Sequence, residues 1–250
     1  ACGEIEERRT PVEHQMDTRV IVPATYTAPG QSETYCTVCG TVLSTDEIPV
    51  LNIEDRLADV ANGQWFTPFI AYCLDEGLMS GQVEYVGNGR EYFRPDSTMT
   101  RAELVTVLYN MEGQPAVEVE PIFDDVAAGQ WFAEEVTWAA QNGIVFGTSE
   151  TEFSPNAPIS RQDLAAILYR YAVNYKGLEL TVEDPEEQLS AYVDVNQIAT
   201  HGWMPLAALN KAGVITGDGD RLKPQDSASR GEVASMMNRF VVNVLEAEEA

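Results

Sequence analysis

The sequence predicts a mainly α-helical protein made of three copies of one helix–loop–helix unit, preceded by a small β-rich module. Three stretches share the same spacing of an apolar residue, a proline and an arginine. After each arginine, apolar residues fall at positions +3, +7 and +10, which lie on one face of a helix. The first 50 residues lack this pattern and instead carry short β-rich runs. We therefore expect one small strand module followed by a repeated helical part.

Residues 1–50 are predicted to form the β module. Val, Ile, Thr and Tyr concentrate at 20–22, 25–27, 34–35 and 41–43, and turn-forming residues such as Pro29-Gly30 separate these runs. This pattern indicates three or four short strands. The boundary of the module is expected near residues 50–56.

The first half of each repeat opens with Asp-Val and continues into a short helix that ends at a glycine. The opening residues are Asp59, Asp125 and Asp194. Trp65 and Trp131 follow six residues after the first two of them. The third repeat carries one extra residue, and His201 stands at the Trp position.

The second half of each repeat begins with a Phe-x-Pro-like turn and a Thr/Ser-Arg-x-Glu/Asp tetrad. The tetrads run from Thr100 to Glu103, from Ser160 to Asp163 and from Ser229 to Glu232. A Ser or Thr at the N-cap with an acid three residues later forms a capping box, so each tetrad predicts a helix start. The repeats are therefore expected at residues 54–113, 120–176 and 189–245, with polar linkers between them.

The arginine of each tetrad occupies the first helical position, where the helix dipole disfavours a cation. Its presence in all three repeats indicates that Arg101, Arg161 and Arg230 have partners. The partner is either a carboxylate of the protein, such as an opening Asp, or an anionic ligand held together with helix-start N–H groups. A Trp beside an Arg and an Asp suits carbohydrate, because it offers a flat apolar face next to charged hydrogen-bonding groups. Trp65 and Trp131 are equally suited to a core, and the residues alone leave these alternatives open.

The composition excludes several classes of function. The 250-residue chain has 15 Lys+Arg and 40 Asp+Glu, a formal net charge of −25, so we expect neither nucleic acid nor an anionic membrane surface as a partner. No apolar segment approaches the ~20 residues that span a bilayer, so no membrane insertion is expected. Nucleotide-binding and metalloprotease motifs are absent, and two histidines allow no Ser-His-Asp arrangement, so we expect no enzyme.

Together, the Asp-Val, Trp-Phe, Gly-x-x-x-Gly, Phe-x-Pro and Thr-Arg-Ala-Glu motifs resemble the S-layer homology (SLH) domain, three times in tandem over roughly residues 54–245. The resemblance implies a pseudo-threefold, three-pronged helical unit with ligand grooves between adjacent repeats. It implies that the tetrad arginines hold an acidic sugar substituent, helped by an opening Asp and a Trp. The implied ligand-binding residues are Arg101, Arg161, Arg230, Asp59, Asp125, Asp194, Trp65 and Trp131. Because the third repeat has His201 at the Trp position, we expect two good grooves rather than three.

The resemblance also implies a function and a location. It predicts non-catalytic anchoring of an extracellular protein to the bacterial cell wall or S-layer. The implied partner is the secondary cell-wall polysaccharide attached to peptidoglycan, whose acidic sugars are often pyruvylated in this family. One alternative is a structural subunit of an S-layer or surface filament that self-associates. Another is the anchoring part of a secreted enzyme. No cofactor is expected in the repeats.

The β module contains three of the four cysteines of the chain. Cys36 and Cys39 form a Cys-x-x-Cys-Gly motif that resembles a zinc knuckle, and Cys2-Gly3 resembles half of a second knuckle. Cys2, Cys36 and Cys39 are therefore candidate ligands of a structural zinc ion, with His14 as a further candidate. A disulfide of Cys2 with one of the pair, or no bridge, is the alternative. Cys73 lies on the apolar side of the first repeated helix and is expected in the core.

Overall fold

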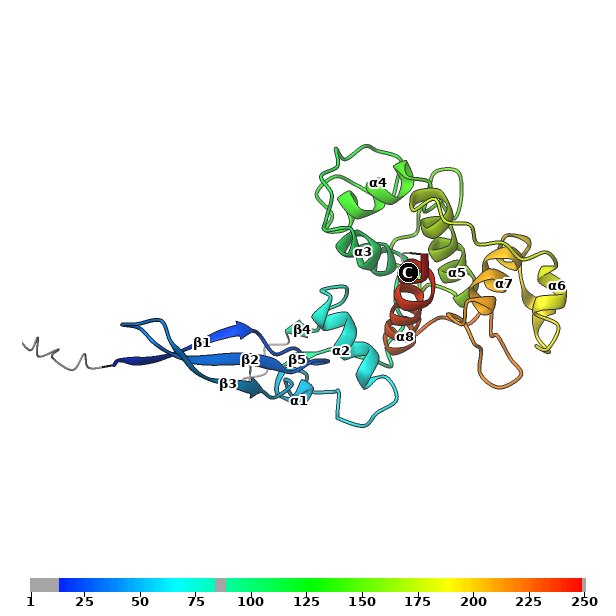
Figure 1. Cartoon of the computed structure of the whole chain (residues 1–250). Helices are drawn as coiled ribbons and strands as arrows, with labels where there is room; N and C mark the ends of the chain where they lie inside the picture. Colours follow the sequence, from blue (N-terminus) through cyan, green and yellow to red (C-terminus); the bar gives the residue numbers. More distant parts are fainter. Residues whose placement is uncertain (1–13, 84–88, 249–250) are drawn as a thin grey trace, which may run out of the picture. The chain divides into compact units, whose positions relative to one another are not determined.

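The computed structural model describes residues 14–83 and 89–248. The chain divides into two compact units, residues 1–52 and 53–250. Strands make up the first unit, and the helices of the second unit carry the repeated motifs (Figure 1). Among the described residues, no helix combines the length and the apolar character needed to cross a lipid bilayer.

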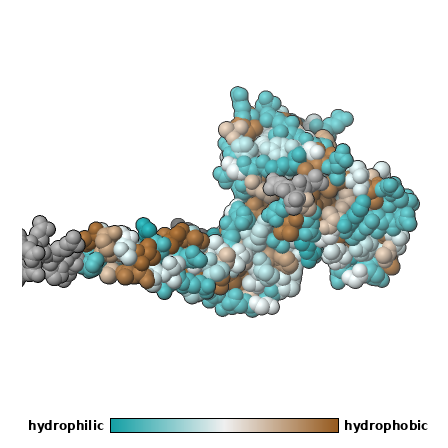
Figure 2. Space-filling view, viewed as in Figure 1, coloured by the Kyte–Doolittle hydropathy of each residue, from teal (hydrophilic) through white to brown (hydrophobic). Residues whose placement is uncertain are grey.

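The first unit is an antiparallel sheet of three strands, β1 (Met16–Val22), β2 (Gly30–Cys36) and β3 (Val42–Ile48), in the order β1-β2-β3. Every residue of β1 and the first six residues of β3 are exposed. Figure 2 shows the resulting apolar surface along this unit, where Val20 is 61% exposed. Of the described residues of the unit, only Gly30 and Cys36 are buried. The sheet therefore depends on its hydrogen-bond ladder more than on a core of its own.

Each repeat of the second unit contributes two helices in the described part of the chain. The first helices are α2 (Thr67–Asp75), α4 (Ala133–Gln141) and α7 (Trp203–Lys211). The second helices are α3 (Arg101–Met111), α5 (Arg161–Arg170) and α8 (Arg230–Phe240). The second helix of each repeat packs against the first helix of the next, in the pairs α3–α4, α5–α7 and α8–α2 (Figure 1). Because the last pair joins the third repeat to the first, the contacts close a ring.

Short elements connect these helices. They include α1 (Ile53–Arg56), α6 (Pro185–Gln188) and the two paired strands β4 (Gln82–Val83) and β5 (Glu91–Tyr92). Helices α5 and α8 continue into the π-helical turns η1 (Tyr171–Tyr175) and η4 (Val241–Leu245). The 3₁₀ turns are η2 (Val195–Gln197), η3 (Thr200–Gly202) and η5 (Glu246–Glu248).

The prediction of a mainly α-helical protein is wrong. Of the described residues, only 37% are helical and 14% lie in strands, and the first unit is a three-stranded antiparallel sheet. The physical reason is the shortness of the repeated helices, which contain 9 to 11 residues. Much of each repeat consists of turns and loops that are held by side chains and by neighbouring repeats rather than by helical hydrogen bonds.

The predicted helix starts are present, with one local difference. Thr100 and Ser229 each form a complete capping box with the glutamate at the third helical position. In the middle repeat, Ser160 accepts the N–H of Asp163, but its hydroxyl donates to Asp163 Oδ2 at 2.7 Å. An aspartate is one methylene shorter than a glutamate, and its carboxylate therefore meets the cap side chain instead of the cap N–H.

The apolar positions after each arginine form the core of the ring, as predicted. Eight of these nine side chains are 0% exposed: Leu104, Leu108, Leu164, Leu168, Tyr171, Val233, Met237 and Phe240. Cys73 is also buried. At the centre, the buried residues Met99, Ile159 and Ala228, each two positions before an arginine, form a closed triangle of backbone hydrogen bonds of 2.8–3.0 Å. Each repeat thus pairs with both of the others.

Candidate functional site

The three tetrad arginines join successive repeats. All three are buried, and each donates from Nε to the carbonyl of the residue that opens the Phe-x-Pro-like turn of the next repeat. The distances are 2.9 Å from Arg101 to Phe153, 2.9 Å from Arg161 to Leu222 and 2.8 Å from Arg230 to Phe93. The partner of each arginine is therefore, in the first place, the backbone of the neighbouring repeat.

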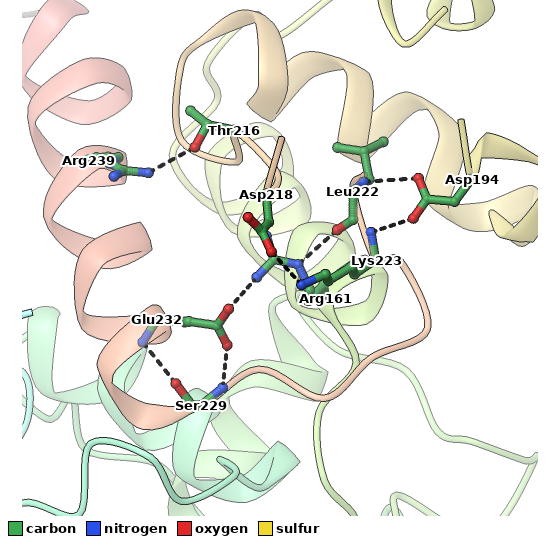
Figure 3. A network of polar contacts seen from close by, with 9 residues as sticks. All are labelled: Arg161, Asp194, Thr216, Asp218, Leu222, Lys223, Ser229, Glu232 and Arg239. Atoms are coloured by element: carbon green, nitrogen blue, oxygen red, sulfur yellow. Dashed lines mark hydrogen bonds and ion pairs between the residues drawn. The ribbon is translucent and has the colours of Figure 1, made fainter. Parts of the chain in front are cut away.

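Each guanidinium donates one further hydrogen bond. Arg101 Nη2 donates to Phe146 O at 3.0 Å, and Arg230 Nη2 donates to Ser80 O at 2.9 Å. Arg161 differs, because its Nη1 donates to the carboxylate of Glu232 at 3.1 Å (Figure 3). Within the described residues, one Nη group of Arg101 and of Arg161 has no hydrogen-bond partner, so each retains donor capacity for a ligand.

The opening aspartates hold the turns to which the arginines bind. Each carboxylate accepts two consecutive backbone N–H groups of its own repeat, at 2.6–2.9 Å. In the third repeat Asp194 accepts the N–H groups of Leu222 and Lys223 (Figure 3). The middle residue of each turn, Arg94, Ser154 or Lys223, has a positive φ of 55–58°, which is costly for a residue other than glycine. The two hydrogen bonds of the aspartate stabilise that backbone.

The first N–H groups of the tetrad helices are bonded within the protein and do not form an open anion site, which was one of the two alternatives that the sequence left open. In α3, Arg101 N donates to Ala157 O and Ala102 N donates to Pro155 O, both at 3.0 Å. The third N–H, of Glu103, donates to the cap residue Thr100. Equivalent bonds are made at α5 and α8. An anionic ligand would therefore meet side chains here rather than the backbone.

Burial and neighbouring carboxylates shift the pKa of the tetrad arginines in opposite directions. Desolvation lowers the pKa of Arg101, whereas Asp163 and the opening Asp125 raise it. Desolvation likewise lowers the pKa of Arg230, against Glu103 and the opening Asp59. Because arginine titrates far above neutral pH, both guanidinium groups stay charged. Asp125 and Asp59 thus lie within electrostatic range of the arginine from the preceding repeat in the ring.

Three cavities lie beside the arginines, and each is lined by all three repeats. The Arg101 groove, of about 370 Å³, is lined by that arginine, by Phe146–Thr148 and α5, and by His201. The Arg161 groove, of about 180 Å³, is lined by that arginine, by Val214, Thr216, Gly217 and α8, and by Trp65. The Arg230 groove, of about 260 Å³, is lined by Leu78–Ser80 and α3, and by Trp131. An arginine from one repeat, a loop and helix from the next, and an aromatic side chain from the third therefore meet each time.

The family model for the S-layer homology domain matches residues 56–105, 122–165 and 192–234, which together are more than half of the chain. The chain belongs to the S-layer homology domain family. Its three SLH repeats are the three repeats of the ring described above.

Several curated proteins are similar to the SLH part. The Surface-layer 125 kDa protein of Lysinibacillus sphaericus is 30% identical over 177 residues, 68% of this chain and 14% of that protein. The S-layer protein sap of Bacillus anthracis is 25% identical over 193 residues, 76% of this chain and 22% of that protein. An Endoglucanase of Bacillus sp. (strain KSM-635) is 26% identical over 188 residues, 75% of this chain and 19% of that protein. The chain therefore spans less than a quarter of each of these relatives.

In the SLH ring, each predicted tryptophan lies in the groove of an arginine from a different repeat. Trp65 belongs to the first repeat but lines the groove of Arg161, and Trp131 lines the groove of Arg230. The groove without a tryptophan is consequently that of Arg101, where His201 stands in its place. The sequence predicted a poorer groove because the third repeat has His201 at the Trp position, and in the structure His201 lines the Arg101 groove.

The two groove tryptophans are far more exposed than core residues. Trp65 is 58% exposed and Trp131 is 59% exposed, and each packs edge-on against the following phenylalanine, Phe66 or Phe132. The phenylalanine is buried and anchors the segment. The indole face therefore remains available beside a groove that contains a cation.

Two further arginines line the grooves, and sequence reasoning missed both. Arg170 lies in the Arg101 groove and Arg239 in the Arg161 groove, each nine positions after the tetrad arginine of its own helix. Nine helical positions correspond to half a turn beyond two full turns, so these side chains face the groove on the opposite side of the helix. Asn110 takes this position in the Arg230 groove. The signal in the sequence is a second cation at a fixed spacing in a strongly acidic chain.

The grooves consequently differ in their chemistry. The Arg161 groove combines two arginines with an exposed tryptophan, and the carboxylate of Glu232 forms an ion pair with Arg161. The Arg101 groove has two arginines, but His201 contacts Asp163 at 2.9 Å, and this pair occupies part of the wall. The Arg230 groove has one arginine and a tryptophan, with Glu103 Oε1 3.6 Å from Arg230 Nη1.

In the first unit, the structure brings together His14 with the cysteines of the Cys-x-x-Cys motif. His14 Nδ1 lies 3.2 Å from Cys36 Sγ and 3.6 Å from Cys39 Sγ. Backbone N–H groups, chiefly that of Cys39, lower the pKa of the Cys36 thiol. Cys2, the third predicted ligand, lies outside the described residues.

Proposed function

We propose that the SLH repeats hold the protein at the bacterial cell surface by binding an acidic secondary cell-wall polysaccharide in the grooves of the ring, without catalysis. The observation that carries this proposal is the Arg161 groove, where exposed Trp65 lies beside Arg161 and Arg239. An exposed indole next to two cations suits a carboxylated sugar, since its ring stacks on the indole while its carboxylate accepts from a guanidinium.

The same residues define how the binding works. The carboxylate of the sugar accepts hydrogen bonds from the Nη group of Arg161 that has no partner among the described residues, and Arg239 adds a second positive charge to the same groove. The chain carries a net charge of −25, so its overall field opposes an anionic polymer. Affinity therefore arises at short range, inside the groove, where screening by salt is weaker than at the open surface.

More than one groove in a ring favours a polymer over a single sugar. A groove of this size offers few contacts, and one site of this kind binds weakly. Once one groove holds a repeating polymer, a second groove meets the same chain at high effective concentration. A polysaccharide with regularly spaced acidic sugars is therefore the expected partner, and a free sugar is expected to bind more weakly.

The proposal is tested by sedimentation of the chain with purified Gram-positive cell walls, before and after removal of the wall polysaccharide. Trp65→Ala removes the exposed indole and leaves every arginine contact in place. We expect a decrease in affinity of about tenfold, equivalent to ~1.4 kcal/mol. Trp203→Ala is the matched control, because Trp203 is half-buried and lines a different cavity, beside Asp184. Unchanged binding of Trp65→Ala, or equal retention on walls stripped of the polysaccharide, would refute the proposal.

Self-assembly is the second candidate function, because relatives include proteins named as S-layer proteins. In that case the chain would form sheets or filaments through protein–protein contacts in the absence of walls. Analytical ultracentrifugation across a concentration series distinguishes the two. Sedimentation as one discrete species at all concentrations supports anchoring, and progressive growth supports assembly.

A further inference from the structure

The first unit contains a cluster of metal-binding side chains that the SLH grooves do not use. His14 Nδ1, Cys36 Sγ and Cys39 Sγ all lie within 4.8 Å of one another. His14 precedes β1, Cys36 ends β2, and Cys39 follows in the turn toward β3. The cluster therefore lies at one end of the sheet, where β1 begins and a turn joins β2 to β3.

The backbone positions these three side chains. Cys36 lies opposite Met16 in the β1–β2 ladder, which brings His14 next to the Cys-x-x-Cys turn. Thr37 N donates to Gln15 O at 2.9 Å, and Cys36 N donates to Thr41 O at 2.9 Å. The turn is thus tied to the strands on both sides, and the donors are oriented by the fold rather than by chance proximity of exposed side chains.

The distances suit tetrahedral zinc. With Zn–S near 2.3 Å and Zn–N near 2.0–2.1 Å, a tetrahedral ion separates a sulfur from a nitrogen ligand by about 3.6 Å. The two observed separations are 3.2 Å and 3.6 Å. The described cysteines are not joined in a disulfide. A small adjustment of the side chains would therefore place all three donors around one ion.

The described part of the first unit, residues 14–52, has almost no core of its own. Of its described residues only Gly30 and Cys36 are buried, and the apolar residues of β1 are exposed. Modules of this size without a core generally need a disulfide or a metal ion, and a structural zinc supplies folding energy directly. Cys36, the one buried side chain with a donor atom between residues 14 and 52, belongs to the cluster.

We propose that His14, Cys36 and Cys39 bind a structural zinc ion that fastens the end of the three-stranded sheet. The donor set of two sulfurs and one imidazole nitrogen matches zinc better than calcium or magnesium, which prefer oxygen ligands. Three protein ligands leave one tetrahedral position for a further donor. The role of the ion is mechanical: it ties the start of β1 to the β2–β3 turn.

The test uses the full chain, reduced and freed of metal by a chelator, then titrated with cobalt(II) and separately with zinc. We expect one metal ion per chain by elemental analysis, and thiolate-to-cobalt charge-transfer bands with the intense visible bands of a tetrahedral site. Cys36→Ser and His14→Ala are expected to lose the charge-transfer bands or the tetrahedral spectrum. The control is Cys73→Ser, which alters a thiol buried in the other unit and is expected to keep the charge-transfer bands and the tetrahedral spectrum.

Two results would overturn the proposal. One is a wild-type chain that binds no more cobalt or zinc than Cys36→Ser. The other is a reduced-and-refolded chain in which the proteolytic peptide that contains both Cys36 and Cys39 is two hydrogens lighter, because these two cysteines then form a disulfide in preference to the metal site. Far-ultraviolet circular dichroism of each variant verifies that the SLH unit is folded, so loss of metal is not confused with global unfolding. Wall binding is measured separately and is expected to be unchanged.

Discussion

Replacing Arg230 by alanine tests the conclusion that the tetrad arginines hold the SLH ring together. Arg230 is 9% exposed and donates to Phe93 O at 2.8 Å and to Ser80 O at 2.9 Å. Its guanidinium also lies 4.8 Å from the centre of the Phe93 ring. These contacts link the third repeat to the first, across 137 and 150 positions of sequence. Their loss is expected to weaken the closure of the ring.

The magnitude follows from the number of contacts. Hydrogen bonds to a charged group contribute about 1.5–3 kcal/mol each, so the two bonds of Arg230 correspond to roughly 3–6 kcal/mol. Natural domains have a total stability of about 5–15 kcal/mol. We therefore expect Arg230→Ala to remove a large part of the free energy of unfolding of the SLH unit. An alanine substitution of a tetrad arginine consequently confounds ligand binding with folding.

Denaturant unfolding followed by tryptophan fluorescence measures this effect. All four tryptophans lie in the second unit, so the signal reports on the ring. Arg221→Ala is the control, because Arg221 is exposed, and its substitution is expected to change stability by less than about 0.5 kcal/mol. A destabilisation of Arg230→Ala below about 1 kcal/mol would refute the structural role, since two buried charged hydrogen bonds cannot be lost at so small a cost.

Three further predictions follow from buried polar groups. Asp125→Asn keeps the size of the side chain but replaces one of the two acceptors of the Phe153 and Ser154 N–H groups, and chemical denaturation should show a loss of about 1–3 kcal/mol; an unchanged midpoint would contradict this. Burial raises the pKa of Glu135, because the charged carboxylate is less stable there than in water, so Glu135→Gln should raise the melting temperature at pH 7. The gain should vanish at low pH, where the carboxyl of the wild-type protein is protonated. A gain independent of pH would show that it does not come from the charge of Glu135. Burial raises the pKa of the Cys73 thiol to about 12, so alkylation at pH 8 should modify Cys73 only after unfolding, as measured by mass spectrometry of tryptic peptides; modification in the native protein would contradict its burial.

Local features of the SLH repeats were predictable because they depend on residues close together in the sequence. The capping residues Thr100 and Ser229 act on an N–H group three positions away, and the apolar stripe after Arg161 follows from helical periodicity. The overall proportion of helix was not predictable in the same way. The turns around Ser154 are fixed by Asp125, 29 positions away, and no local pattern measures how much chain such turns occupy.

In the candidate site, too, local features were predictable from the sequence, and contacts between repeats were not. The sequence indicated that three arginines at helix starts must have partners, because a cation there is opposed by the helix dipole. It left open whether these partners were internal or external. The structure places each arginine against the backbone of the next repeat, and one guanidinium nitrogen of Arg101 and of Arg161 has no hydrogen-bond partner in the described part of the chain.

The sequence by itself determined the repeat, the positions of its helix starts and the identity of the core face, since these follow from spacing within a single helix or turn. Only the tertiary structure decided which residues share a groove. Trp65 meets Arg161, and His201 meets the groove of Arg101, because the third repeat packs back on the first and closes the ring. That closure depends on the packing of helices from different repeats, and the spacing of residues within one repeat does not predict which helices pack together.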